Sequence, residues 1–422
     1  MKKYIITNLC VLLLYFLSMP GYSQGFGASG LSMGGAYIAV ARGVDAFAWN
    51  PANLSLSTQN KFELNLVAAN INVVNSSLTL SEYERYFTDS GHHGFWDTND
   101  IDHILGLIPD GGLQTSAEGH GNVMGLMFGR YGISAQVIGR ALGILPKSLF
   151  ELGLRGNQEL YKEFGINDLD GDAFSAVKLS LSLSHPLTVK RYFDEFSIGL
   201  NVNYYLGLGE ASVTRAEGAF VTTRTAILTT LDITSRQAEF GNGFGFDVGA
   251  AGKIADRWTV SMAFYNVLAR INWTQQTEES RTYFLVDSVK IGEFEEGNTI
   301  DTTITRSIDP YTTSLPLVFH AGAAYQFLDN LIFALDIEQA FEERMGYSDR
   351  ALLALGVQYS PADIVPIRAG MSFGGAWDYR FGIGCGLHLG FFHLDLAYAM
   401  HKGLWPTSAK GISTAANIKL VF

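Results

Sequence analysis

The sequence is poor in the residues that mark several common protein classes. It has 2 cysteines among 422 residues, at positions 10 and 385, and Cys10 lies in a leading apolar segment. Removal of that segment would leave only Cys385, which excludes an intrachain disulfide. Lys and Arg total 29 against 41 Asp and Glu. Because phosphate contacts need clustered basic side chains, this balance argues against nucleic acid as a partner.

Long hydrophobic runs are missing beyond the first residues. Residues 1–23 combine Lys2 and Lys3, an apolar run and small residues just before Gln24, which predicts a secretory signal peptide. After it, no stretch approaches the ~20 apolar residues that a membrane-spanning helix needs. Yet hydrophobic residues make up 47% of the chain and aromatic residues 13%. The apolar side chains must therefore be spread over many shorter elements.

Those elements show a period of two. In residues 331–338, for example, apolar side chains alternate with Ala334, Asp336 and Glu338, and Asp395 lies between Leu394 and Leu396. Successive side chains of a strand point to opposite faces, so each segment has one apolar face and one polar or small face. The same pattern predicts strands at 61–70, 122–130, 133–142, 174–185, 195–210, 243–253, 258–272, 315–327, 331–342, 350–360, 366–375, 379–389, 391–401 and 411–422.

A large soluble β-sandwich or propeller would also alternate, but three features favour a membrane barrel. The strands are about as long as the ~9–11 residues that cross a bilayer at a tilt. Their polar faces carry ionisable groups, and the connections mostly alternate between short and long. Bacterial outer-membrane barrels share an even strand count, short periplasmic turns and long extracellular loops. The sequence therefore predicts an all-β, transmembrane antiparallel β-barrel of about 14 strands.

Further expectations follow from the barrel. The predicted location is the outer membrane of a Gram-negative-type bacterium, with outer-membrane lipid as a partner. The last strand ends on Phe422, an aromatic terminus that resembles the signal read by the barrel insertion machinery. Helical periodicity over Asp97–Ile108 and within residues 145–164 predicts short helices in extracellular loops. Such helices could pack the loops or receive an apolar ligand.

The stretch from Gly25 to Ser55 contains two enzyme-like patterns. It includes the G-x-G-x-x-G spacing of a dinucleotide-binding loop and the G-x-S-x-G spacing of a hydrolase elbow. Both patterns need a preceding strand, and none is predicted before this stretch. With no Ser, His and acid arrangement on adjacent strand positions either, the sequence predicts a protein that is not an enzyme and has no catalytic residue or cofactor.

Instead, this stretch resembles the N-terminal hatch of the long-chain fatty acid transporter family of outer-membrane barrels and its relatives. The resemblance rests on Gly30, Met33–Ala36, Ala39, Asp45-Ala46 and Asn50-Pro51-Ala52 with Leu54; Asn53 departs from it. With the signal peptide at 1–23, it implies a hatch at 24–60 and a barrel at 61–422.

A wide barrel needs something to occupy its lumen. Alternatively, Asn50-Pro51-Ala52 is only the turn into the first strand. The hatch and gating residues expected are Gly34, Gly35, Asp45, Asn50, Pro51 and Ala52.

Ionisable residues on the polar strand faces are expected to form hydrogen bonds in the lumen, around the hatch. They are Glu63, Lys178, Asp247, Asp336, Glu338, Arg368, Arg380, Asp395 and Lys419. No metal site is predicted. Asp168, Asp170 and Asp172 alternate as calcium ligands do, but the loop lacks the glycine and closing glutamate of an EF-hand. Nothing fixes a geometry for His92 and His93 with Asp97.

Two functions remain open from the sequence. The first is a channel for hydrophobic small molecules of the fatty acid or hydrocarbon class, which diffuse passively under control of the hatch. The second is an interaction protein of a secretion system, because similar hatch-bearing barrels include the type IX secretion shuttle proteins.

Overall fold

The computed structural model describes residues 27–56, 61–88, 91, 95–189, 191–290, 299–362 and 364–422, without the side chains of 287–290. The predicted signal peptide at 1–23 lies outside these residues. Strands dominate the fold, and one 17-stranded antiparallel sheet contains all of them.

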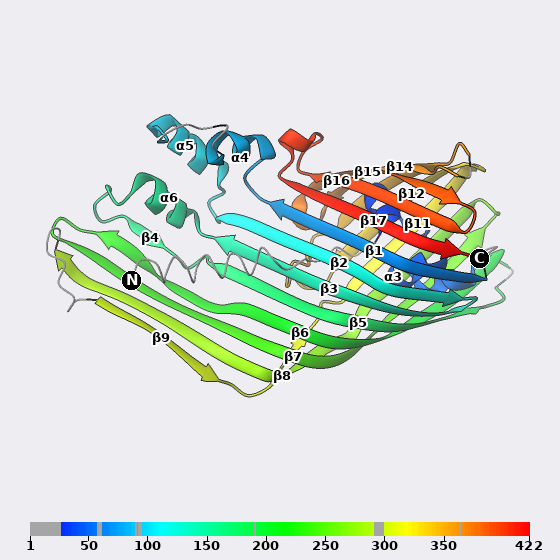
Figure 1. The fold of residues 1–422 in the computed structure, drawn as a ribbon, viewed down its shortest axis with the longest axis horizontal. Coiled ribbons are helices and arrows are strands. Elements are labelled where there is room, and N and C mark those ends of the chain that lie inside the picture. The colour runs from blue at the N-terminus through cyan, green and yellow to red at the C-terminus, as the bar shows by residue number, and fades with distance from the viewer. Residues whose placement is uncertain are drawn as a thin grey trace.

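Fourteen of the strands close into a barrel. Closure occurs where the first strand pairs with the last, from Glu63 opposite Val421 to Val74 opposite Gly411 (Figure 1). The barrel strands are β1 Phe62–Asn75, β2 Leu113–Phe128, β3 Tyr131–Leu145, β5 Asp170–Pro186, β6 Glu195–Thr222, β7 Ala226–Ile254, β8 Trp258–Lys290, β11 Val318–Leu328, β12 Leu331–Ala340, β13 Leu352–Tyr359, β14 Ile367–Gly374, β15 Tyr379–Leu389, β16 Phe392–His401 and β17 Gly411–Val421. Three further short strands pair with β6 or β8. They are β4 Glu163–Gly165, which pairs with β6, and β9 Thr299–Ser307 and β10 Tyr311–Ser314, which pair with β8.

The alternation of side chains separates the outside of the barrel from the inside. On β12, Leu335 and Ile337 are 46% and 44% exposed on the outer face, whereas Asp336 between them is 1% exposed. An apolar outer face is what lipid requires, and a closed ring of strands leaves no unpaired backbone edge in it. The prediction of a 14-strand antiparallel β-barrel is therefore confirmed.

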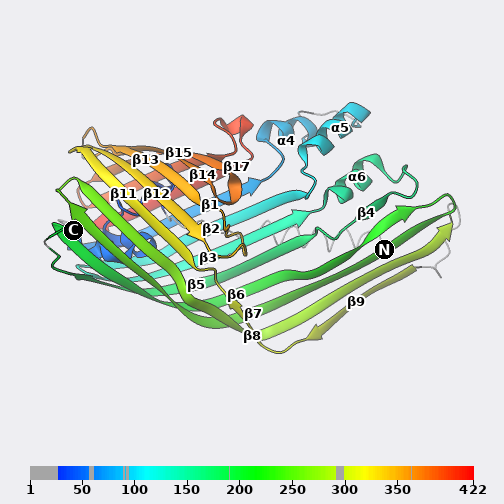
Figure 2. The same ribbon diagram turned by 180° about the vertical axis from the view of Figure 1, so that it is seen from behind.

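Three strands are much longer than the sequence pattern predicts. The residues between about 211 and 242 were expected to form a loop, but β6 and β7 continue through them as a hairpin. Similarly, β8 runs on to Lys290 and pairs with β9. Figure 2 shows this extension projecting beyond the other strands. On β6 no side chain from Ala211 to Val221 is buried, so this part of the strand does not need the apolar alternation that marks the membrane strands.

Three helices lie in the long connections. They are α4 Leu80–Phe87, α5 Thr98–Leu107 and α6 Lys147–Arg155. The sequence predicts α5 and α6 but not α4. Helix α5 buries Ile104 and Leu105, whereas α6 has no fully buried residue. Within the described residues, no helix is both long enough and apolar enough to cross a membrane.

Residues Gly27–Leu56, here called the N-terminal segment, lie within the ring of strands (Figures 1 and 2). The segment contains α2 Ala28–Ser32, η1 Gly43–Asp45, α3 Ala46–Trp49 and η2 Pro51–Ser55. At one side α2 packs on β15, β16 and β17, and at the other η2 packs on β5, β6 and β7. Most of its side chains are buried, although it contains no strand that pairs with the wall.

Candidate functional site

The turn at Asn50-Pro51-Ala52 is held to the barrel wall by side-chain hydrogen bonds. The Asn50 amide nitrogen donates to the Ala250 and Met262 carbonyls, at 3.0 Å each, and to Ser261 Oγ at 2.7 Å. Its Oδ1 accepts from the Ala52 backbone N–H at 2.9 Å, which closes the turn before Pro51 starts η2. An asparagine in extended backbone before a proline suits both tasks. One side chain thus fixes the turn and joins it to β7 and β8.

The Ala52 carbonyl adds a second attachment. It accepts from Ser184 Oγ at 3.0 Å and from Ser197 Oγ at 2.7 Å. Gly199 lies directly beneath, because a Cβ atom there would be 2.1 Å from the Ala52 nitrogen. Where η2 lies closest to the wall, the wall therefore supplies two hydroxyl donors and a glycine, whose lack of a side chain leaves room for the turn.

Asp336 holds the middle of the segment. Its Oδ2 accepts from the backbone N–H groups of Tyr37 and Ile38, at 2.8 and 2.9 Å, and lies 3.0 Å from His320 Nε2. The carboxylate and the imidazole are both almost fully buried. Glu338, on the same face of β12, has an oxygen 3.4 Å from His320 Nδ1. Charge-assisted bonds to backbone N–H groups are among the stronger hydrogen bonds of proteins.

Two further acidic residues connect the segment to the strands near the barrel closure. Asp45 Oδ2 lies 2.8 Å from Lys419 Nζ and accepts from the Tyr37 hydroxyl at 3.1 Å. Lys419 is also 3.8 Å from Asp395, which is 2.7 Å from Arg368. These charges alternate in sign, so each buried charge has an opposite neighbour, as buried ions require.

Glu63 and Asp247 are buried on other parts of the inner face. Glu63 Oε2 accepts from the Val44 backbone N–H at 2.9 Å. Asp247 is 3.1 Å from Lys178 Nζ and accepts from the Asn201 and Asn203 amides at 3.1 and 2.9 Å. Asn201 also donates to the Phe47 carbonyl at 2.9 Å. Asp247 and Lys178 therefore act on the segment through an asparagine rather than directly.

Gly34 lies where the segment touches β14, and Gly35 lies beside Arg380 of β15. Gly34 has a φ of +66°, and a Cβ atom there would be 2.6 Å from the Met371 nitrogen, so a larger residue would be strained and would collide with backbone. The Gly34 carbonyl accepts from Arg380 Nη2 at 2.9 Å. Facing it, a Cβ on Gly370 would be 2.1 Å from the Met33 carbonyl carbon. Close backbone contact explains the small residues on both sides.

The contact between segment and wall is otherwise apolar. Met33, Ile38 and Trp49 pack with Tyr265 and Val318 of the wall. The remaining wall members are small: Ala263, Ala324, Ala334, Ala340 and Ala354. The Trp49 carbonyl also accepts from the Tyr265 hydroxyl. The segment is thus held by a limited set of polar bonds around a core of van der Waals contacts.

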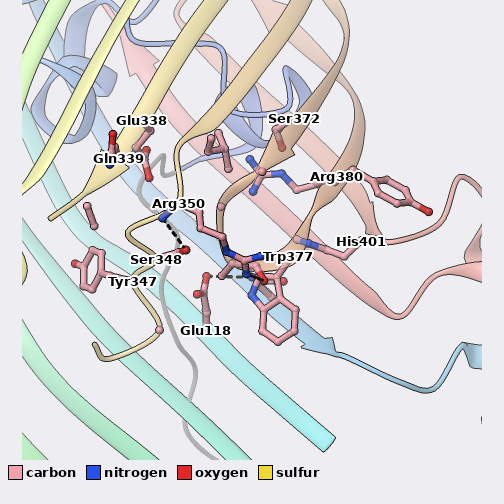
Figure 3. A pocket seen from close by; sticks show the side chains of 18 of the residues that line it. Glu118, Glu338, Gln339, Tyr347, Ser348, Arg350, Ser372, Trp377, Arg380 and His401 are labelled. Atoms are coloured by element: carbon pink, nitrogen blue, oxygen red, sulfur yellow. Dashed lines mark hydrogen bonds between the residues drawn. The ribbon is translucent and has the colours of Figure 1, made fainter. Parts of the chain in front are cut away.

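A cavity of about 100 Å³, lined by charged, polar and aromatic side chains, lies at the end of the barrel with the long connections. Its residues come from strands far apart in the chain, so no sequence pattern indicates the cavity, although Glu338 and Arg380 were predicted to face the lumen. Figure 3 shows Arg380 and His401 near the same space as Glu118 and Trp377. Other lining residues include Asn72, Arg140, Glu338, Tyr347, Arg350 and Ser372. Arg380 links this cavity to the segment, through its bond to Gly34.

Hydrogen bonds run around the cavity wall. Asn72 Nδ2 donates to Glu118 Oε2 at 3.0 Å, and its Oδ1 accepts from Ser413 Oγ at 2.9 Å. The Arg140 guanidinium lies 3.8 Å from the centroid of the Tyr347 ring. In the turn beyond the rim, Lys402 Nζ is 2.8 Å from Asp378 and its hydrogen bond holds the pKa of that carboxyl below its usual value. The cavity therefore combines hydrogen-bonded polar side chains with aromatic and apolar ones such as Trp377 and Leu352.

Two of the three aspartates of the acidic motif accept hydrogen bonds from backbone N–H groups. Asp172 accepts from the Met345 backbone N–H at 3.1 Å, and Asp170 accepts from Gly171, at 2.8 Å. His92 and His93 lie outside the described residues, and Asp97 caps α5. Among the residues that the structure describes, no group of three or more His, Cys, Asp or Glu side chains is placed to hold a metal ion.

Three solved structures share the fold. The toluene transporter TbuX of Ralstonia pickettii has a TM-score of 0.51 and 14% identity, over 94% of this chain and 99% of that chain. The toluene transporter TodX of P. putida has a TM-score of 0.53 and 12% identity, over 94% and 99%. A FadL homologue of Pseudomonas aeruginosa has a TM-score of 0.51 and 13% identity, over 94% and 98%. The resemblance to the long-chain fatty acid transporters is confirmed at the level of fold.

Sequence comparison is less informative about activity. No curated protein matches the chain significantly. A family model described as a family of unknown function, DUF5723, matches residues 51–398 of the 422-residue chain. The protein therefore belongs to the DUF5723 family.

Proposed function

We propose that this protein is a passive outer-membrane channel for hydrophobic small molecules of the fatty acid or hydrocarbon class, and that the N-terminal segment is its hatch. The observation that carries the proposal is the apolar contact between segment and wall. Met33, Ile38 and Trp49 cover wall alanines that would line the lumen if the segment moved. An apolar route lined by small residues suits an apolar passenger. The transporters of toluene with the same fold point to this chemical class.

The polar attachments of the hatch can break one at a time. The bonds of Asn50, Asp336 and Arg380 to the segment or the wall are separate in space, and each can open without unpairing a strand. Arg380 lines the cavity at the end with the long connections and also holds the Gly34 carbonyl. A molecule that enters from this end would pass the exposed Arg350 and reach Arg380 inside the cavity. Its arrival would then loosen the contact at Gly34 and Gly35, and the anchor at Asn50-Pro51-Ala52 would keep the hatch attached.

Uptake by intact cells tests this function. Cells that make the protein should accumulate labelled toluene or a long-chain fatty acid faster than cells without it. Asp336→Ala removes the acceptor of two segment N–H groups and should change the initial rate severalfold. Asn203→Ala is the matched control, because that buried side chain bonds to Ser180 and Asp247 of the wall. Equal uptake with and without the wild-type protein would reject the transport function, and a co-purifying secreted protein would then favour the secretion-system alternative.

A further inference from the structure

The start of the short helix α4 is fixed by hydrogen bonds. It starts five residues after the end of β1, at Leu80. The Thr79 backbone N–H donates to Glu82 Oε2 at 2.7 Å, and the Glu82 N–H donates to Thr79 Oγ1 at 3.2 Å. This reciprocal capping box satisfies two otherwise unpaired donors. The Leu80 N–H also donates to the Ala409 carbonyl at 3.2 Å, which ties the helix to the connection before β17.

The apolar stripe of α4 points away from the protein. Leu80, Tyr83 and Phe87, spaced as one helix face, are 43%, 51% and 41% exposed. The side that packs on the protein is marked by Tyr86, which is buried with its ring centroid 5.4 Å from that of His103 on α5. A surface helix of a soluble protein normally turns its apolar stripe toward the core. In α4 this arrangement is reversed.

A neighbouring connection extends the same apolar surface. Leu404 and Trp405, just before η5 (Pro406–Ser408), are 54% and 74% exposed. Helix α4 packs against η5. We call Leu80, Tyr83, Phe87, Leu404 and Trp405 the α4 patch. Exposed apolar patches with aromatic residues mark sites of contact with a partner or a membrane.

The α4 patch continues the lipid-facing surface of the barrel. Val73 of β1 pairs with Ile412 of β17 near the ends of these strands, and both point outward, at 50% and 43% exposure. Leu80 follows Val73 by seven positions, and Ile412 follows Trp405 by seven positions. Figure 1 shows α4 near the ends of β1 and β17. The patch therefore lies at the level where the outward apolar residues of these two strands stop.

We propose that the α4 patch lies in the lipid surface of the outer leaflet, with α4 as an interfacial helix. Aromatic residues are enriched at the rims of membrane barrels, and an amphipathic helix in the interface buries its apolar face among lipid chains. The charged residues of α4 are Glu82, Glu84 and Arg85, of both signs, so the attraction is apolar and does not depend on lipid charge. This docking is independent of transport through the lumen.

Spin labels on the full chain in lipid nanodiscs test the proposal. Labels are placed in a C385S background, because Cys385 is exposed. A label at Tyr83→Cys or Trp405→Cys should show a ratio of oxygen to nickel-complex collisions severalfold above that at Ser81→Cys, which lies on the polar side of α4. A label at Ile71→Cys, 53% exposed on β1, gives the reference for a lipid-facing site. The ratios should be the same in zwitterionic and anionic nanodiscs.

Two outcomes would overturn the proposal. Equal collision ratios at Tyr83 and Ser81 would place the helix in water. A low accessibility to both oxygen and nickel, with dipolar coupling between labels of two molecules, would show that a second copy covers the patch instead. Uptake assays are unaffected by either outcome, so failure here is distinct from failure of the proposed transport function.

Discussion

The two faces of a single barrel strand place different requirements on their side chains. On β16, Leu396 is 48% exposed on the outer face, and any apolar side chain of similar size would serve there. Asp395, one residue earlier, is fully buried and is fixed by Arg368 at 2.7 Å, His388 at 3.2 Å and Lys419 at 3.8 Å. A position on the outer face needs only an apolar side chain, whereas a position on the inner face needs a side chain that fits its particular hydrogen-bonding and charged partners. Substitutions on the two faces should therefore fail for different reasons.

The largest effect is expected on the inner face. Asp395→Ala leaves the buried cations Arg368 and Lys419 without the carboxylate between them. Removing one member of a buried ion pair typically costs about 3–5 kcal/mol of the free energy of unfolding. Urea unfolding of the lipid-reconstituted protein, followed by heat-modifiable mobility, measures the loss. Asp395→Asn, which keeps the size and an acceptor, should lose less; equal losses would show that the charge is irrelevant.

A charge on the outer face should be nearly as costly, for the opposite reason. Leu396→Arg exposes a guanidinium to lipid, which costs about 2–4 kcal/mol near the middle of the bilayer. The same unfolding assay applies. Leu396→Phe is the control and should be close to neutral, because it keeps the apolar surface. Tolerance of arginine at position 396 as good as that of phenylalanine would contradict a lipid-facing assignment.

A smaller effect is expected where the inner face meets the N-terminal segment. Asn50→Ala removes three donor bonds to the wall and the acceptor of the Ala52 N–H. Unpaired buried groups cost about 1–3 kcal/mol, and here the loss should fall on the attachment of the segment rather than on the strands. Hydrogen exchange should accelerate within residues 27–56 while β7 and β8 stay protected. Faster exchange in those strands instead would show that Asn50 supports the wall itself.

The same distinction explains what could be predicted from the sequence. A lipid face imposes an apolar residue at every second position, so strands such as β12 and β16 and the count of fourteen were readable. The extensions of β6 and β7 were missed because no regular alternation of apolar side chains marks them, and on β6 no side chain from Ala211 to Val221 is buried. Helix α4 was missed although Thr79 and Glu82 carry the spacing of a capping box. The start of α4 could therefore have been predicted from this spacing.

The contact partners of the inner-face residues could not be predicted from the sequence. The alternation marks Asp336 as a polar position, but its bonds to Tyr37 and Ile38 join residues 299 and 298 positions apart. Likewise, Gly370 appears in the sequence as one more small residue, whereas in the structure it makes room for Met33. Such pairings depend on the curvature and register of the whole barrel, which no local pattern records.

Single-channel conductance tests the central claim, that the N-terminal segment closes the lumen, most directly. The wild-type protein and a variant lacking residues 25–48, which keeps the anchor at Asn50, are compared in planar lipid bilayers. The account predicts a wild-type protein that is mostly closed and a deletion variant with a raised, unselective conductance, because a barrel of this width is not filled by its own side chains. A folded, inserted deletion variant that stays closed would contradict it, since another part of the chain would then be the barrier.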